Sequence, residues 1–139
     1  EQIDEVKIFV KKNQLNSVKV LGRLDYSEVP TIYALSDIFV IPTLEDNWSL
    51  VVPEAMACGL PIISSKYNGC WPELVKPENG WVFDPLDKIN FIETLHNAIE
   101  NKDTWKQMGE ASVKIVANFS PEKIAAQIFK SCKNVLANN

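Results

Sequence analysis

Residues 39–65 of this chain read FVIPTLEDNWSLVVPEAMACGLPIISS. Residues 38–41 form a continuous apolar run, which is typical of a parallel strand buried on both faces. The acidic loop that follows leads into a short helix, because Pro53 is tolerated in a first helical turn and Gly59 ends the helix. Residues 60–65 then predict a second buried strand. The stretch is expected to form a βαβ unit, whose strand-to-helix loop lies at the carboxyl edge of the sheet, where open α/β folds bind ligands.

Helices and strands alternate along the rest of the chain. The further predicted elements are a helix over residues 1–14, a strand over 18–21, a helix over 27–35, a strand over 80–83, and helices over 88–101, 103–116 and 121–136. Asp87 is expected to cap the N-terminus of the helix over 88–101. Trp105 and Phe129 are expected in the core. The alternation predicts an α/β fold of the Rossmann-like kind, with three layers (α/β/α) and a parallel sheet of about four strands wound by right-handed crossovers.

The composition excludes several classes of protein. The 139 residues suffice for one domain with its own core, and a net charge of -4 without a dense basic run does not indicate a nucleic-acid partner. No segment approaches 18 continuous apolar residues, and no signal peptide is visible. The three cysteines and one histidine match no zinc or redox spacing, and a reduced cytoplasmic context is the simplest interpretation.

Two acids in the central stretch carry a family resemblance. Asp46 lies in the loop and Glu54 in the first helical turn, and the pattern of an acid, seven residues and then Glu-Ala-Met-Ala-Cys-Gly-x-Pro surrounds them. This pattern resembles the donor-site signature of retaining glycosyltransferases of the GT-B fold, family four, also called glycosyl transferases group 1. That signature usually begins Glu-Gly-Phe-Gly, where this chain has Asp-Asn-Trp-Ser from residue 46. The resemblance extends over residues 18–136 and implies the C-terminal half of a GT-B fold.

The resemblance implies transfer of a sugar from a nucleotide-diphosphate-sugar donor to a glycan, lipid or small-molecule acceptor, with retention of configuration. It assigns Glu54 to the donor ribose and Asp46 to a hydroxyl of the transferred sugar, and carboxylates accept strong hydrogen bonds from such hydroxyls. The backbone N–H groups of Trp48, Ser49 and Leu50 are expected to open toward the helix N-terminus. The partial positive charge there suits a leaving diphosphate.

Other residues have two interpretations each. Arg23, after the first predicted strand, and Lys66, after the strand of residues 60–65, could approach the nucleotide or its phosphates, or they could be solvated surface residues. Trp48 either lines the sugar pocket or covers the loop against the core. Asp46 could cap its own turn, and Glu54 could act only on the helix dipole.

We expect residues 1–139 to be a donor-binding domain, truncated at its N-terminus and lacking the N-terminal domain that binds most of the acceptor. Such a fragment is expected to be inactive alone. No metal cofactor is expected, because the sequence has no Asp-x-Asp motif and the resemblance implies chemistry without a metal. The resemblance fits polysaccharide biosynthesis in the cytoplasm, where the full-length protein could lie peripherally at the inner face of the membrane only through the missing domain.

Three alternatives remain at this point. Another GT-B enzyme, such as a nucleotide-sugar epimerase or a phosphorylase, would require acids and histidines from a partner domain or a cofactor lysine. A non-catalytic nucleotide-binding or protein-interaction module is suggested by the departures at Asp46 and Ser49. An unrelated dinucleotide binder is disfavoured, because no Gly-x-Gly-x-x-Gly follows the first predicted strand. The sequence does not indicate the nucleotide, the sugar, the acceptor or the oligomeric state.

Overall fold

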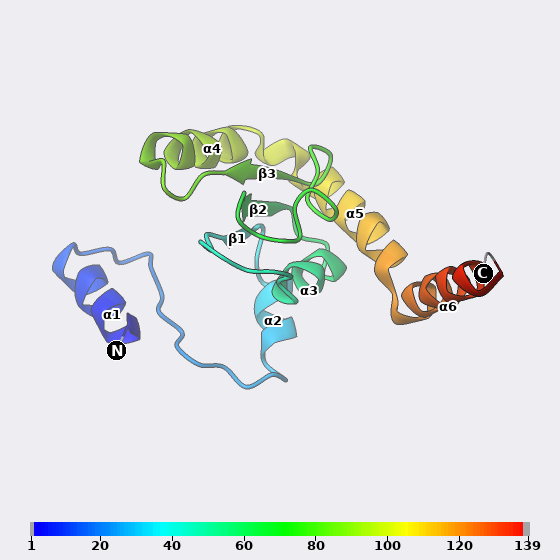
Figure 1. Ribbon diagram of the computed structural model, residues 1–139. Helices are drawn as coiled ribbons and strands as arrows, with labels where there is room; N and C mark the ends of the chain where they lie inside the picture. The colour runs from blue at the N-terminus through cyan, green and yellow to red at the C-terminus, as the bar shows by residue number, and fades with distance from the viewer. Residues whose placement is uncertain (1, 138–139) are drawn as a thin grey trace. The chain divides into compact units, whose positions relative to one another are not determined.

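The computed structural model describes residues 2–137 (Figure 1). These residues divide into two units between Ile32 and Tyr33. The first unit contains helix α1 (Gln2–Lys12), which confirms the predicted N-terminal helix. Helix α2 (Val29–Ala34) crosses the boundary between the units. It begins two residues after Ser27, the residue at which the sequence predicted the start of this helix.

The prediction of a strand over Val18–Leu21 is wrong. These residues form no strand, and the N–H of Val18 instead donates to the carbonyl of Leu15 in a turn (3.0 Å). Val18 and Leu21 are also 46% and 53% exposed. An extended segment becomes a strand only when a neighbouring strand accepts and donates its backbone hydrogen bonds, and the first unit supplies no such neighbour among its described residues.

The second unit is built on a parallel sheet of three strands, one fewer than the approximate count expected. β1 (Phe39–Ile41), β2 (Ile62–Ser65) and β3 (Gly80–Phe83) lie in the order β1-β2-β3. Every residue of the central strand β2 is buried. These strands confirm the three apolar runs predicted for this part of the chain, which are typical of strands covered on both faces.

Helices cover both faces of this sheet. Ile62 and Ile63 are both buried, and neighbouring side chains of a strand point to opposite faces. Helix α4 (Lys88–Glu100) packs its residues Phe91, Leu95 and Ala98 against Ile63 and Phe83 on one face. Helix α3 (Val51–Ala57) contacts β2, and Figure 1 shows it on the other side of the strands from α4. The predicted three-layer, Rossmann-like α/β architecture is confirmed.

The remaining helices follow α4 in sequence. They are η1 (Lys102–Thr104), α5 (Trp105–Val116), η2 (Ala117–Phe119) and α6 (Pro121–Ala137). The indole N–H of Trp105 donates to the carbonyl of Ala98 (2.8 Å), so this half-buried residue ties α5 to α4.

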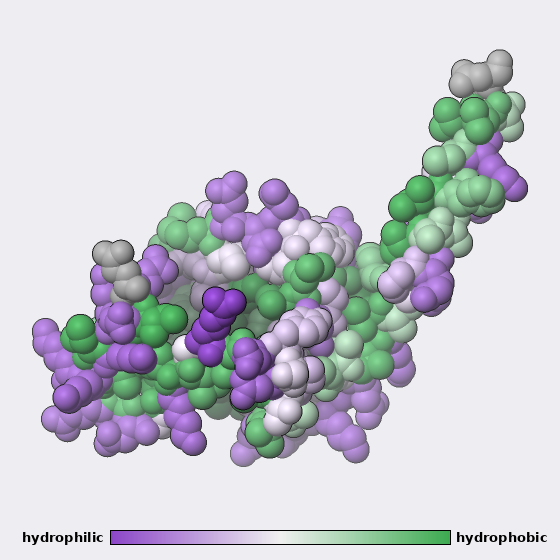
Figure 2. Space-filling model, turned by 90° about the horizontal axis from the view of Figure 1, so that it is seen from below, coloured by the Kyte–Doolittle hydropathy of each residue, from purple (hydrophilic) through white to green (hydrophobic). Residues whose placement is uncertain are grey.

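Helix α6 buries none of its residues, and hydrophobic side chains are visible along its surface in Figure 2. Phe129 is 63% exposed, so its predicted place in the core is wrong. The apolar spacing predicted the helix correctly, but a stripe indicates only which face can be buried and not whether a neighbour covers it. None of the helices described between residues 2 and 137 is both long and apolar enough to cross a membrane.

Candidate functional site

The carboxyl ends of the three strands meet at one edge of the sheet, because the strands are parallel. The loop of residues 42–50 follows β1, Lys66 to Gly69 follow β2, and Asp84 follows β3. Asp46 and Asn68 pair as an isolated parallel bridge, and the N–H of Gly69 donates to the carbonyl of Asp46 (2.7 Å). The backbone therefore joins the first two loops at the edge where the sequence placed the candidate site.

Gly69 makes this junction possible. A Cβ atom at residue 69 would lie 1.8 Å from the carbonyl oxygen of Asn47 and 2.5 Å from its carbonyl carbon. Both atoms belong to the backbone of the Asp46 loop, so they cannot move aside as a flexible side chain would. Only glycine allows the two loops to approach this closely.

The Asp46 carboxylate is held by its own loop. One of its oxygens accepts the backbone N–H of Trp48 (3.1 Å), and the other accepts the hydroxyl of Ser49. Asp46 as a whole residue is half-buried. Asp46 therefore makes the loop-capping contacts that the sequence offered as one interpretation, and its contact with a donor sugar stays a prediction.

Two buried polar side chains support this carboxylate. Asn68 and Ser49 are 1% and 4% exposed, and the Asn68 amide donates to the Ser49 hydroxyl oxygen (3.0 Å). The N–H of Cys70 donates in turn to the Asn68 side-chain oxygen (2.9 Å). Burial raises the pKa of the Cys70 thiol, which contacts the Ser49 carbonyl at 3.4 Å. Asn68 was assigned no role from the sequence alone. Its place between a buried strand and Gly69 is the signal that marks a polar residue able to hold the neighbouring loop.

Glu54 lies in the first turn of α3 and is half-buried. Its carboxylate accepts a hydrogen bond from the hydroxyl of Tyr33 (3.3 Å). Tyr33 is buried, and its ring meets that of Phe39 edge-on, with centroids 5.9 Å apart. Tyr33 was missed because it lies 21 residues before Glu54 in the sequence, and no local pattern joins the two.

The backbone donors of the loop are only partly available. The N–H of Trp48 is taken by Asp46, so it cannot also point at a phosphate. The N–H groups of Ser49 and Leu50 donate no hydrogen bond to the protein within residues 2–137. Helix α3 starts after Leu50, and no side chain caps it. Two of the three predicted donors therefore have no partner among the described residues, and their contact with a diphosphate stays a prediction.

Lys66 already has a carboxylate partner. Its ammonium lies 2.6 Å from Asp84, which follows the next strand, and the two side chains are 42% and 26% exposed. The hydrogen bond with Asp84 raises the pKa of Lys66, and the same contact lowers the pKa of Asp84. Lys66 stands at the predicted edge, but a phosphate would have to compete with Asp84 for it.

Trp48 packs toward the C-terminal part of the chain. Its ring lies 6.2 Å from that of Phe119, and the two line an apolar pocket of about 410 Å³ with Leu50, Pro53, Leu74 and Ile124. The indole is 42% exposed. These contacts favour the interpretation that Trp48 covers the loop, because the pocket beside it offers almost no polar group to a sugar.

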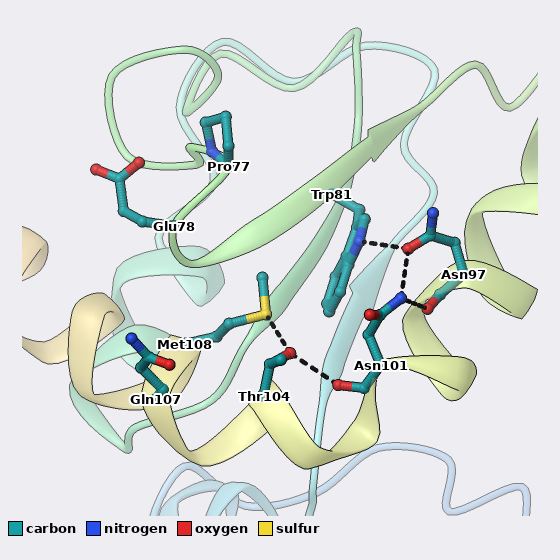
Figure 3. A pocket seen from close by; sticks show the side chains of 8 residues that line it. All are labelled: Pro77, Glu78, Trp81, Asn97, Asn101, Thr104, Gln107 and Met108. Atoms are coloured by element: carbon teal, nitrogen blue, oxygen red, sulfur yellow. Dashed lines mark hydrogen bonds between the residues drawn. The ribbon is translucent and has the colours of Figure 1, made fainter.

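A second pocket, of about 510 Å³, lies beside the start of β3 and so away from the carboxyl edge (Figure 3). Its polar side chains largely pair among themselves. The indole N–H of Trp81 donates to Asn97 (3.2 Å), the Asn101 amide donates to the Asn97 carbonyl (2.8 Å), and the Thr104 hydroxyl donates to the Asn101 carbonyl (2.7 Å). These bonds join β3, α4 and η1, and the pocket shares no residue with the candidate site.

Two predictions stay open, one about Arg23 and one about the metal. Arg23 belongs to the first unit, and its approach to the nucleotide stays a prediction. Residues 2–137 contain no group of three or more His, Cys, Asp or Glu side chains that could hold a metal ion, and the expectation that the chemistry needs no metal also stays a prediction.

Comparison with known proteins agrees with this fold. An uncharacterized glycosyltransferase of Methanocaldococcus jannaschii is 26% identical over 126 residues, which are 91% of this chain and 36% of that protein. A D-inositol 3-phosphate glycosyltransferase of Corynebacterium diphtheriae is 30% identical over 103 residues, 74% of this chain and 24% of that protein.

Solved structures share the architecture. The HepE protein of Anabaena, crystallised in complex with UDP, superposes with a TM-score of 0.80 at 24% identity, over 95% of this chain and 36% of that one. The chain thus spans about a third of the length of such proteins. The family model for glycosyl transferases group 1 matches residues 4–115. With most of its length inside that match, the chain belongs to glycosyl transferases group 1.

Proposed function

We propose that this chain is the donor-binding, C-terminal domain of a retaining glycosyltransferase and that it binds a nucleotide-diphosphate sugar at the carboxyl edge of the sheet. The observation that carries the proposal is the Glu54 carboxylate. It stands in the first turn of α3, half-buried, with the hydroxyl of the buried Tyr33 as its partner. A carboxylate held in this way can accept hydrogen bonds from the hydroxyl groups of a ribose.

Asp46 is proposed to accept a hydroxyl of the transferred sugar. Each of its oxygens has two lone pairs and accepts one hydrogen bond within the loop, so each retains an acceptor position. The open N–H groups of Ser49 and Leu50 are proposed to face the diphosphate, whose leaving charge they would stabilise. Arg23 and Lys66 are proposed as the basic residues near the nucleotide, with Lys66 leaving Asp84 when the donor binds.

The donor class is supported by structural neighbours. HepE of Anabaena was solved with UDP and with UDP-glucose, and this chain superposes on those structures with TM-scores of 0.80 and 0.66. The nucleotide-sugar class is the part of this likeness that we transfer to the chain. No metal is proposed for the chemistry, since hydrogen-bond donors and cations can stabilise the diphosphate.

The acceptor is proposed to bind mainly to a second, N-terminal domain, because the chain spans about a third of its relatives' length. The acceptor would be a glycan, a lipid or a small molecule, and transfer would take place in the cytoplasm or at the inner face of the membrane. Polysaccharide biosynthesis is the process we propose. The chain alone should bind donor and transfer nothing.

Calorimetric titration with UDP, GDP, ADP and their common sugar conjugates tests the proposal. Glu54→Ala removes a charge-assisted hydrogen bond and should raise the dissociation constant about tenfold to hundredfold, equivalent to about 1.5–3 kcal/mol. Glu93→Ala is the matched control, because Glu93 is an exposed acid on α4. Equal affinities of wild type and Glu54→Ala would contradict the ribose assignment.

Two observations favour a second candidate, a non-catalytic module derived from the same fold. Both oxygens of Asp46 already accept hydrogen bonds from their own loop, and Lys66 is paired with Asp84. Polar side chains that pair with one another in this way are also expected at a site that only stabilises the fold. Failure of every nucleotide and nucleotide sugar to bind the wild-type chain would favour this candidate over the donor-binding domain.

A further inference from the structure

Two of the departures from the glycosyltransferase signature, at residues 46 and 49, are joined by a hydrogen bond. This chain has Asp46 in place of the usual Glu and Ser49 in place of the second Gly, and the Ser49 hydroxyl donates to the Asp46 carboxylate. We propose that Ser49 and Asn68 are positioning residues, which hold the shorter Asp46 carboxylate in place for the donor sugar. The inference rests on the proposed function, in which Asp46 contacts that sugar.

The direction of the hydrogen bonds is fixed by a backbone group. The N–H of Cys70 can only donate, so the Asn68 side-chain oxygen accepts from it (2.9 Å), and the Asn68 amide nitrogen is turned toward Ser49 (3.0 Å). The Ser49 oxygen accepts from that amide, which leaves its single proton for Asp46. The chain of bonds thus ends on the carboxylate as an acceptor.

This arrangement is rigid because its inner members are buried. Asn68 and Ser49 are 1% and 4% exposed, so water does not compete for their hydrogen bonds. The Trp48 N–H holds the other carboxylate oxygen at 3.1 Å. With a donor on each oxygen, the Asp46 carboxylate is held in one orientation, and each oxygen retains a lone pair that can accept a further hydrogen bond.

The two departures also match each other in size. A glutamate at position 46 would carry its carboxylate about 1.5 Å further, the length of one C–C bond, and so past the donors that now hold Asp46. A glycine at position 49 has no side chain and would give the carboxylate no hydroxyl donor. Asp46 with Ser49 therefore forms a self-consistent pair, in which the hydroxyl compensates for the missing methylene by fixing the carboxylate.

The inference is tested by titrating wild type and variants with UDP, UDP-glucose, GDP, GDP-mannose, ADP and ADP-glucose. Ser49→Ala should raise the dissociation constant for the sugar nucleotide about tenfold and leave that for the free nucleotide within about twofold, because only the sugar meets Asp46. In the Asp46→Ala background, Ser49→Ala should change neither constant by more than about twofold, because its target is gone.

The matched control is Ser112→Ala. Ser112 is also fully buried, and its hydroxyl donates to the Leu60 carbonyl (2.7 Å) at the other end of β2, so its loss should lower stability and leave both affinities unchanged. Ser49→Gly, which restores the residue of the signature, is the second variant if Ser49→Ala does not fold.

The outcomes separate the two proposals. If wild type binds a sugar nucleotide and Ser49→Ala binds it equally well, the positioning role is refuted and the donor-binding function stands. An equal loss for nucleotide and sugar nucleotide, or a loss that persists in the Asp46→Ala background, also refutes it, since either result indicates a general effect on structure. If wild type binds none of the six compounds, the proposed function fails, and the inference fails with it.

Discussion

Gly69→Ala should separate the two loops that form the candidate site. The new Cβ would lie 1.8 Å from the Asn47 carbonyl oxygen, and real Cβ atoms essentially never come closer than 3.0 Å to such an atom. The loops must therefore move apart by at least the difference of 1.2 Å. The same movement applied to the 2.7 Å hydrogen bond from the Gly69 N–H to the Asp46 carbonyl brings it to about 3.9 Å, beyond hydrogen-bond distance.

The loss of stability caused by Gly69→Ala follows from the hydrogen bonds that it breaks. One backbone hydrogen bond contributes about 1 kcal/mol, and displacing Asp46 from Ser49 and Asn68 weakens buried polar contacts of similar value. We expect unfolding free energy to fall by about 2–4 kcal/mol, which corresponds to a decrease in melting temperature of about 6–12 °C for a chain of this size. Affinity for a sugar nucleotide should fall with it.

Urea unfolding followed by tryptophan fluorescence measures this change. All four tryptophans lie in the second unit, at residues 48, 71, 81 and 105, so the signal reports on the unit that contains the loops. Gly59→Ala is the control, because residue 59 has a φ of +80° but ordinary space, with Val113 at 3.9 Å. It should cost only about 1 kcal/mol for the backbone conformation. If Gly69→Ala costs no more than Gly59→Ala, the reasoning from close approach is refuted.

The remaining predictions concern charge and thiol reactivity. Because Lys66 lowers the pKa of Asp84 below its ordinary 3.8, the pair stabilises the fold above that pH, and this contribution is lost as the pH falls through the lowered pKa. In urea titrations, the unfolding free energy of Asp84→Asn should therefore fall less than that of wild type as the pH drops below about 4. An equal fall for the two proteins would contradict the pairing. Cys58 and Cys132 are exposed and Cys70 is buried with a raised pKa, so iodoacetamide should label two cysteines in the native protein and three after unfolding. Mass spectrometry counts the labels, and a third label on native protein would argue against the burial of Cys70.

Local signals predicted the elements of the second unit well. The apolar runs of β1 and β2, Pro53 in the first turn of α3 and Asp87 at the start of α4 each act within a few residues. The Asp87 carboxylate accepts the N–H groups of Ile89 and Asn90 at 3.0 and 3.1 Å, as an N-cap should. Elements whose state depends on a distant neighbour were predicted poorly. Val18–Leu21 needed a partner strand, and the apolar stripe of α6 needed a surface to cover it.

The candidate site shows the same difference between local signals and contacts with distant residues. Asp46 and Glu54 could be located from their spacing, because both lie in one contiguous motif. Their partners could not, because Tyr33 and Asn68 come from other elements, 21 residues before Glu54 and 19 residues after Ser49. The salt bridge of Lys66 depends likewise on β3 lying beside β2. Which side chains meet at the edge is decided by strand order and register, and these are properties of the assembled sheet.

The order β1-β2-β3 also sets distances at that edge. Hydrogen-bonded strands lie about 4.8 Å apart, so the ends of β1 and β3 are kept about 10 Å from each other whatever residues follow them. Side-chain substitutions that keep the Gly69 junction change the chemical groups offered at this edge, while the backbone ladder preserves the spacing between the strand ends. Under the proposed function, donor preference would therefore change through the side chains of the loops, without any change in the sheet.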